Sequence, residues 1–249
     1  MSFLPTLTRR QALQVCGATL VVSNVASNRV LGIRGYVPWN LAVASFLLLL
    51  ARRAGHNGAA LGLDPRRLRG AARVGASSAA VVALAYALST ATPVGRAALV
   101  DERAAGVGYR GLWAATLFRI PLGTVVLEEV AFRGVLPALL RDGAERTWRE
   151  DLLAALAFGL WHVLPARGLV QANDVVARVG GRAASVVPRV LAVVVSAAGG
   201  IAFAALRRAG GHLAAPAAVH LAVNVLGYGI AWWRGRPARR RSGTGPLGE

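Results

Sequence analysis

The stretch LEEVAFR, residues 127–133, places three charged side chains inside an apolar run that otherwise has the composition of a membrane span. A charge at the centre of a spanning helix costs about 2.5–3.5 kcal/mol, so this stretch indicates either a functional site or a structural ion-pair cluster. Residues four apart share one face of a helix, and we therefore predict that Glu129 pairs with Arg133. Glu128 points away from this pair and needs a partner from another segment, which leaves it available as a general base.

The composition around this stretch is that of a membrane protein. The 249 residues are 55% hydrophobic and only 16% charged, and the mean hydropathy is +0.49. An ordinary soluble domain is less apolar and more charged. We predict an all-α, polytopic helical bundle with about seven transmembrane helices, within a range of six to eight.

The basic residues are all arginine and give the chain a net charge of +18. They lie in short groups between apolar runs, without interleaved aromatic side chains that could stack on bases. This pattern favours contact with membrane lipid headgroups over nucleic acid binding. Cys16 is the only cysteine, so no intramolecular disulfide can form.

Seven apolar segments are candidates for crossing the membrane. Their bounds are 11–28, 37–50, 71–92, 122–140, 152–164, 186–206 and 213–233. The first resembles a signal peptide, but no Ala-x-Ala site follows it, and we expect a retained anchor. We expect Pro121 to kink or to start the fourth segment. Asp64, before Pro65, is predicted to cap a short interfacial helix.

The segments divide the chain into three regions. Residues 1–110 hold N-terminal transmembrane helices and basic loops, residues 111–233 form the core, and residues 234–249 are a basic tail that we expect to be disordered. Residues 166–185 are a polar connection, and Gly210-Gly211 is a tight turn. The basic loop 52–73 is expected in the cytoplasm together with the N-terminus. Seven crossings place the basic tail on the opposite side, so the positive-inside rule cannot satisfy both.

Few polar side chains with useful chemistry lie inside the spans. The five aspartates fall in loops or at span ends, and the polar set within the spans is Glu128, Glu129, Arg133, His162, His220 and Asn224. Their joint presence favours a buried site over isolated structural residues.

Two kinds of chemistry fit this set. In one, Glu128 activates water, His162 orients it, and His220 with Asn224 donates to the oxyanion. In the other, Glu128, His162 and His220 hold a divalent metal such as zinc. The sequence contains no His-Glu-x-x-His motif and no aspartate pair within a span. None of the serines within the spans lies in a Gly-x-Ser-x-Gly motif.

Three motifs follow one another on successive spans. They are Glu128-Glu129-x-x-x-Arg133, Phe158-x-x-x-His162 and His220-x-x-x-Asn224. In this order they resemble the CPBP family of intramembrane proteases, also called Abi or CAAX-protease-like, with the core resemblance over about residues 111–233. The family includes CAAX prenyl endopeptidases and bacterial proteins linked to bacteriocin self-immunity.

The resemblance implies a role for each motif residue. Glu128 would activate water with help from His162, and His220 with Asn224 would hold the oxyanion. Glu129 and Arg133 would support the site, and Phe158 would be a packing residue. The family is described both as metalloprotease and as metal-independent glutamate protease, so the implied cofactor is either none or a divalent metal.

We therefore expect an endopeptidase in a bacterial plasma membrane, with a peptide or membrane-protein substrate. A bacterial cell without protein prenylation offers no prenylated CAAX substrate. Two other classes stay open: a non-catalytic membrane protein that binds a peptide or confers bacteriocin immunity, and a proton-coupled transporter. A transporter would more often show broken helices in two halves, and this chain has no such repeat. The sequence does not indicate an oligomeric state.

Overall fold

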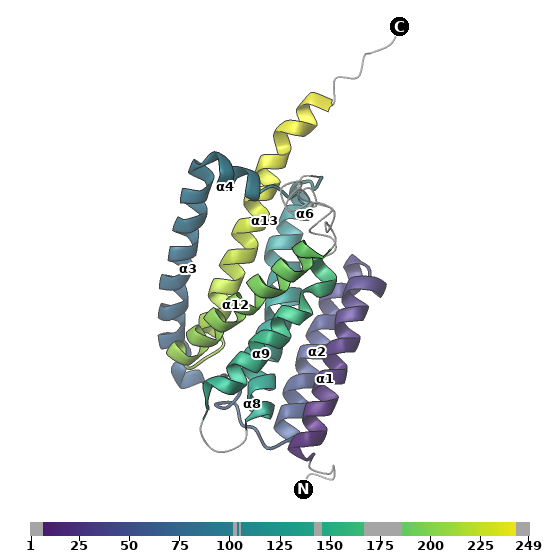
Figure 1. Ribbon diagram of the computed structural model, residues 1–249, viewed down its shortest axis with the longest axis vertical. Helices are drawn as coiled ribbons and strands as arrows, with labels where there is room; N and C mark the ends of the chain where they lie inside the picture. The colour runs from purple at the N-terminus through teal and green to yellow at the C-terminus, as the bar shows by residue number, and fades with distance from the viewer. Residues whose placement is uncertain (1–6, 102–103, 105, 142–145, 167–185, 243–249) are drawn as a thin grey trace.

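The computed structural model describes residues 7–101, 104, 106–141, 146–166 and 186–242. These residues form helices joined by short turns and contain no strand. The all-α membrane fold predicted from the sequence is thereby confirmed. The helices run mostly along the long axis, with the start of the first helix and the end of the last described helix at opposite ends of the bundle (Figure 1).

Before the core, the described chain forms three long helices and one short helix. α1 (Arg9–Val25) continues into a π-helical turn (Ala26–Val30), and α2 (Ile33–Arg53) returns beside it. A 3-10 turn (Pro65–Arg67) then leads into α3 (Leu68–Ala91) and the short α4 (Pro93–Ala98). The predicted cap is present, because Asp64 accepts a hydrogen bond from the Arg66 N–H at 3.0 Å. It caps the 3-10 turn at the start of α3.

In the described residues, the core contains four helical rods. The first is continuous from Tyr109 to Leu140 and consists of α6 (Tyr109–Ala114), a π-helical stretch (Ala115–Val125), α7 (Val126–Glu129), a second π-helical stretch (Val130–Val135) and α8 (Leu136–Leu140). The other three are α9 (Trp148–Trp161), α12 (Val187–Gly210) and α13 (Ala214–Ser242).

Four helices of the described chain are long and apolar enough to cross a membrane. They are Ile33–Arg53, Pro65–Ala91, Arg189–Gly210 and Ala214–Gly235. By contrast, α1 has 17 residues and α9 has 14, fewer than the roughly 20 that span a bilayer. The multi-pass topology therefore agrees with the sequence, while the total of about seven crossings stays a prediction.

The rod from Tyr109 to Leu140 corrects one expectation. Pro121 does not start this helix but lies inside the first π-helical stretch. Proline cannot donate to the helical hydrogen-bond ladder, and a change to wider turns lets the helix continue around the missing donor. The spanning segment is therefore longer than the predicted 122–140.

Small residues allow the core helices to approach closely. Gly159 of α9 faces α12, where a Cβ at this position would lie 2.6 Å from the Val193 carbonyl oxygen. Gly200 of α12 faces α9 in the same way, because its Cβ would lie 3.0 Å from Ala155. Side chains of any size would force these two helices apart.

The turn between α12 and α13 has the predicted glycine geometry. Gly211 has a φ of +66°, a left-handed conformation that glycine adopts without strain. The Leu213 N–H donates to the Gly62 carbonyl at 2.8 Å, so the basic loop before α3 is bonded to the start of α13. Most of the polar connection, residues 167–185, lies outside the described residues.

The last helix continues into the region for which the sequence predicts a disordered tail. α13 runs as far as Ser242. Residues 243–249 lie outside the described chain.

Candidate active site

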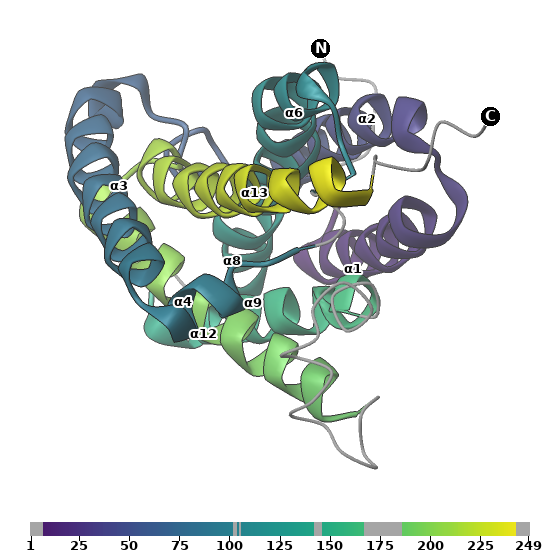
Figure 2. The ribbon, with the colours of Figure 1, turned by 90° about the horizontal axis from the view of Figure 1, so that it is seen from above.

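The site lies where α7 meets α9, α12 and α13. Glu128 and Glu129 form the end of α7, which is flanked by the two π-helical stretches. Every residue from 127 to 139 is buried, so these carboxylates must find their partners within the protein, on their own rod or on neighbouring helices. From above, the rod that carries them begins at α6, beside α2 and α13 (Figure 2).

Glu129 contacts both Arg133 and His220. Its Oε1 lies 3.4 Å from Nη1 of Arg133, so the predicted pair is present. The same Oε1 lies 2.8 Å from Nδ1 of His220 on α13. An ionised carboxylate can only accept a hydrogen bond, which makes Nδ1–H of His220 the donor. Glu129 thus fixes the orientation of the His220 ring.

Glu128 takes its partners from two other helices. Its Oε1 accepts a hydrogen bond at 3.0 Å from the indole N–H of Trp161, at the end of α9. Its Oε2 lies 3.5 Å from Nε2 of His220. This oxygen is buried and has no hydrogen-bond donor among the described residues. One oxygen of Glu128 is therefore held in place, and the other faces the histidine.

His162 follows directly after α9 and is half-buried. Its Nδ1 lies 2.8 Å from the carbonyl oxygen of Phe158. A carbonyl only accepts, so Nδ1 carries the proton in this contact and, in the neutral ring, Nε2 is an acceptor. The ring also packs edge-on against Phe158, with centroids 4.6 Å apart.

Two phenylalanine rings pack around Arg133 and His220. The Arg133 guanidinium lies 4.0 Å from the ring centroid of Phe158 and 4.8 Å from that of Phe203. Phe203 also stacks on His220, with centroids 4.9 Å apart and planes 22° apart. Arg133 is only 2% exposed, and cation–π contacts with desolvated rings stabilise such a charge.

Asn224 lies one helical turn beyond His220 on α13 and is half-buried. Its side chain makes no hydrogen bond within the part of the chain that the structure describes, so its amide N–H groups stay available to a ligand. The structure brings Glu128, Glu129, Arg133 and His220 into contact. It places His162 beside Phe158 and Asn224 next along the helix.

The residues of this cluster fall within one family match. Residues 110–226 match the family model for Rce1-like type II CAAX prenyl endopeptidases. The chain carries an Rce1-like CAAX protease domain. The match supports an intramembrane protease function at the level of the family. No curated protein and no solved structure matched the chain.

The Rce1-like domain accounts for the rods of the core. It begins at the start of α6 and ends within α13, two residues after Asn224. The described helices before it, α1 to α4, lie outside the matched residues. α2 and α3 nevertheless pack against the domain, because the Asn40 amide on α2 donates to the Gly123 carbonyl at 2.7 Å and the Tyr86 hydroxyl on α3 to the Val223 carbonyl at 3.0 Å.

The metal alternative needs Glu128, His162 and His220 to converge on one ion. Glu128 and His220 face each other, while Nδ1 of His162 bonds to a backbone carbonyl and leaves Nε2 as its possible ligand atom. Within the described ranges, no three His, Cys, Asp or Glu side chains converge as a metal-binding group. Zinc sites in catalysis usually need three protein ligands.

Trp161 and Phe203 are contacts that sequence reasoning missed. A weak signal exists for Trp161, since a tryptophan beside His162 in an apolar run needs a partner for its N–H once it is buried. Phe203 is a single aromatic residue in a run of small side chains, SAAGGIAFAAL, residues 196–206. Its contact with His220 depends on how α12 packs on α13, and this packing cannot be predicted from the sequence.

Outside the spanning helices, His212 precedes α13. Its Nδ1 accepts a hydrogen bond from the Ala214 N–H at 3.0 Å, which requires an unprotonated Nδ1. Burial and the positive charge of Arg207 lower the pKa of His212, while Asp64 acts in the opposite direction. The neutral ring therefore helps to cap the first turn of α13.

Proposed function

We propose that the protein is an endopeptidase that hydrolyses a peptide bond of a membrane-associated protein or peptide with water activated by Glu128. The observation that carries this proposal is the asymmetric environment of the Glu128 carboxylate. Trp161 holds Oε1, while the buried Oε2 has no donor among the described residues. An oxygen of this kind suits a water molecule that must be bound and deprotonated.

The reaction needs one proton to pass through Glu128. Water would give a proton to Oε2 as its oxygen attacks the carbonyl carbon, forming a C–O bond and a tetrahedral oxyanion. Glu128 would then return the proton to the leaving nitrogen as the C–N bond breaks. Water is the only co-reactant, and the products are a carboxylic acid and an amine.

The neighbouring residues have complementary roles in this proposal. Nε2 of His162 accepts a hydrogen bond and can orient the attacking water. The free amide of Asn224, next to His220, can donate to the oxyanion, where a preorganised donor contributes most in a site without bulk water. Glu129 and Arg133 are positioning residues, because they act through the ring of His220.

The physiological setting is a further part of the proposal. The absence of lysine and the compact chain support a bacterial plasma membrane, and such a cell offers peptides or membrane-protein tails as substrates.

No step of the proposed reaction depends on a metal. We therefore expect cleavage to persist after treatment with a chelator.

The test is cleavage of a quenched peptide library by the purified protein in liposomes. Glu128→Gln should abolish cleavage and leave the amount of folded protein unchanged. Glu150→Gln is the matched control, because Glu150 forms a capping box with Thr147 outside the cluster, and glutamine also serves in that motif. The control should cleave like the wild type.

Other outcomes would contradict the proposal. Equal cleavage by the wild type and Glu128→Gln would remove Glu128 from the reaction. Tight peptide binding without cleavage in both proteins would identify a non-catalytic peptide-binding protein. Loss of cleavage with a chelator, restored by zinc, would make the reaction metal-dependent.

A further inference from the structure

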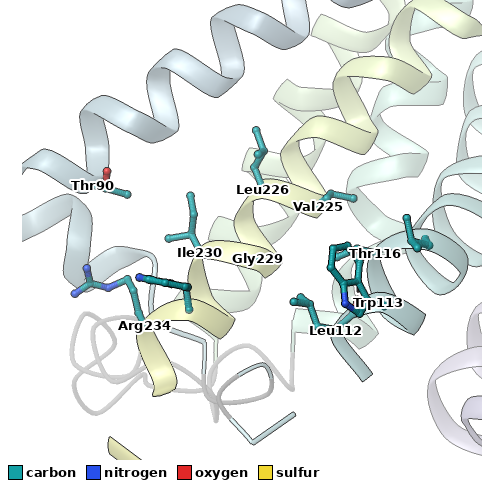
Figure 3. Close-up of a pocket in the computed structure, with 11 residues that line it drawn as sticks. Thr90, Leu112, Trp113, Thr116, Val225, Leu226, Gly229, Ile230 and Arg234 are labelled. Atoms are coloured by element: carbon teal, nitrogen blue, oxygen red, sulfur yellow. Dashed lines mark hydrogen bonds between the residues drawn. The ribbon is translucent and has the colours of Figure 1, made fainter. Parts of the chain in front are cut away.

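An apolar groove lies between the end of α3, the start of the Tyr109–Leu140 rod and the C-terminal half of α13. It encloses about 680 Å³, within the range of ligand pockets. Leu112 and Leu226 are among its walls, and Thr90 of α3 lies across from Ile230 of α13 (Figure 3). The groove is separate from the carboxylate cluster, and its lining contains no acidic residue.

The groove offers few hydrogen-bonding groups to a ligand. It contains two threonines, and both hydroxyls already donate to backbone carbonyls of their own helices: Thr116 to Leu112 at 2.9 Å and Thr90 to Ala87 at 2.7 Å. An extended peptide would leave its backbone groups without partners there, which is costly away from water. A hydrocarbon chain needs no such partners.

One end of the groove carries a positive charge. Arg234 lines it there, and its Nε is buried without a hydrogen-bond partner among the described residues. Trp113 and Trp233 line the groove as well, at 56% and 67% exposure. Tryptophans and arginines are typical of the level at which lipid headgroups begin.

We propose that this groove binds an acyl chain of an anionic phospholipid, with the lipid phosphate on Arg234. The hydrocarbon chain matches the apolar walls, and the phosphate carries the negative charge that pairs with the Arg234 guanidinium. The site is independent of peptide hydrolysis. It lies between the end of α3, which is outside the Rce1-like domain, and α13, which carries His220.

Gly229 provides a way to close the groove. No atom lies within 4 Å of the position that its Cβ would occupy, so Gly229→Leu fills the groove without displacing a neighbour. Gly17→Leu is the matched control, because Gly17 is an exposed glycine on α1 with equally open surroundings. For the charge, Arg234→Gln is compared with Arg34→Gln, an exposed arginine near the start of α2.

The experiment is native mass spectrometry of the full chain released from nanodiscs that contain equal amounts of phosphatidylglycerol and phosphatidylcholine. The wild type should retain phosphatidylglycerol. Gly229→Leu should lower the retention of both lipids about tenfold, and Arg234→Gln should remove about a tenfold preference for the anionic lipid while one lipid stays bound. Both controls should behave like the wild type.

Three results would overturn the lipid site. One is unchanged retention of phosphatidylglycerol in Gly229→Leu. Another is an equal loss of preference in Arg34→Gln, which would mean general attraction to a basic surface. The third is a co-purified peptide that Gly229→Leu displaces, which would make the groove a peptide site.

Discussion

The buried segment 127–139 and the helix α3 differ in where they place charged and apolar side chains. In the segment 127–139 every residue is buried, although three of the thirteen are charged. In α3 only Ala71 and Gly75 are buried, and no charged residue follows Arg73. α3 stands at the edge of the bundle (Figure 1). In a membrane, the apolar surface faces lipid, and charges are stable only where other helices supply partners.

The strongest test of the polar interior is the removal of His220. Among the described residues, His220 is the one whose side chain contacts both carboxylates, and we expect His220→Ala to lower the cleavage rate about a thousandfold. The measurement is peptide cleavage in liposomes, with folded yield followed by size-exclusion chromatography. Ser77→Ala, an exposed polar position on α3, should leave the rate unchanged. Full activity of His220→Ala would place the reaction elsewhere in the chain.

Removal of Arg133 should act on stability. Arg133→Ala leaves the Glu129 carboxylate buried with one partner fewer, and breaking a buried pair in this way costs about 3–5 kcal/mol. We expect a strong decrease in folded protein and in Tm. Arg73→Ala on α3 is the matched control, because Arg73 is exposed and its loss should change stability by less than about 0.5 kcal/mol. Equal yields of the two variants would contradict the comparison.

The lipid-facing surface of α3 can be tested with a new charge. Leu84 is 59% exposed on α3, and Leu84→Glu would place a carboxylate in lipid without a partner. We expect a cost of about 2.5–3.5 kcal/mol in insertion, measured as the membrane-integrated fraction after synthesis with microsomes. Leu84→Val should insert normally. Normal insertion of Leu84→Glu would mean that α3 faces water or protein.

A smaller effect is expected for the hydrogen bond that fixes Glu128. Trp161→Phe keeps an aromatic ring but removes the donor to Oε1, which leaves a buried acceptor unsatisfied at a cost of about 1–3 kcal/mol. We expect kcat to fall about 10- to 100-fold with little change in KM. Trp148→Phe, at the exposed start of α9, serves as the control. A decrease in Tm without a change in kcat would show a structural role only.

The smallest effect is expected for His212, which lies in the turn between α12 and α13. Because the pKa of His212 is lowered in the folded protein, the unfolded chain binds its proton first. Stability should be complete above the ordinary histidine pKa of about 6.5 and decrease as the pH falls below it. The check is Tm between pH 7.5 and 5.5, where His212→Asn should lose less stability than the wild type. Parallel curves would exclude this contribution.

Local features of the fold were accessible from the sequence. The Glu129–Arg133 pair follows from a spacing of four on one helix, the Asp64 cap from its place before Pro65, and the Gly211 turn from glycine's access to positive φ. Each depends on residues a few positions apart. Of the two roles predicted for Pro121, the start of a helix is wrong, because the helix continues through a π-helical stretch that contains this proline.

Contacts between side chains on different helices could not be assigned to particular residues from the sequence. The sequence indicates that Glu128 requires a partner from another segment, but it does not name Trp161, which is 33 positions away. It also does not indicate that His220 would contact both carboxylates, or that Phe203 would stack on its ring. These contacts depend on the rotation and depth of α9, α12 and α13 against α7.

The sequence by itself determined that this is an all-α membrane protein with carboxylates, histidines and an asparagine inside its spans, because composition and helical periodicity are properties of the chain alone. Only the tertiary structure decided which oxygen of Glu128 is held and which is free, and where an apolar groove with a charged end opens. These features arise between helices, where geometry and not residue type sets the distances.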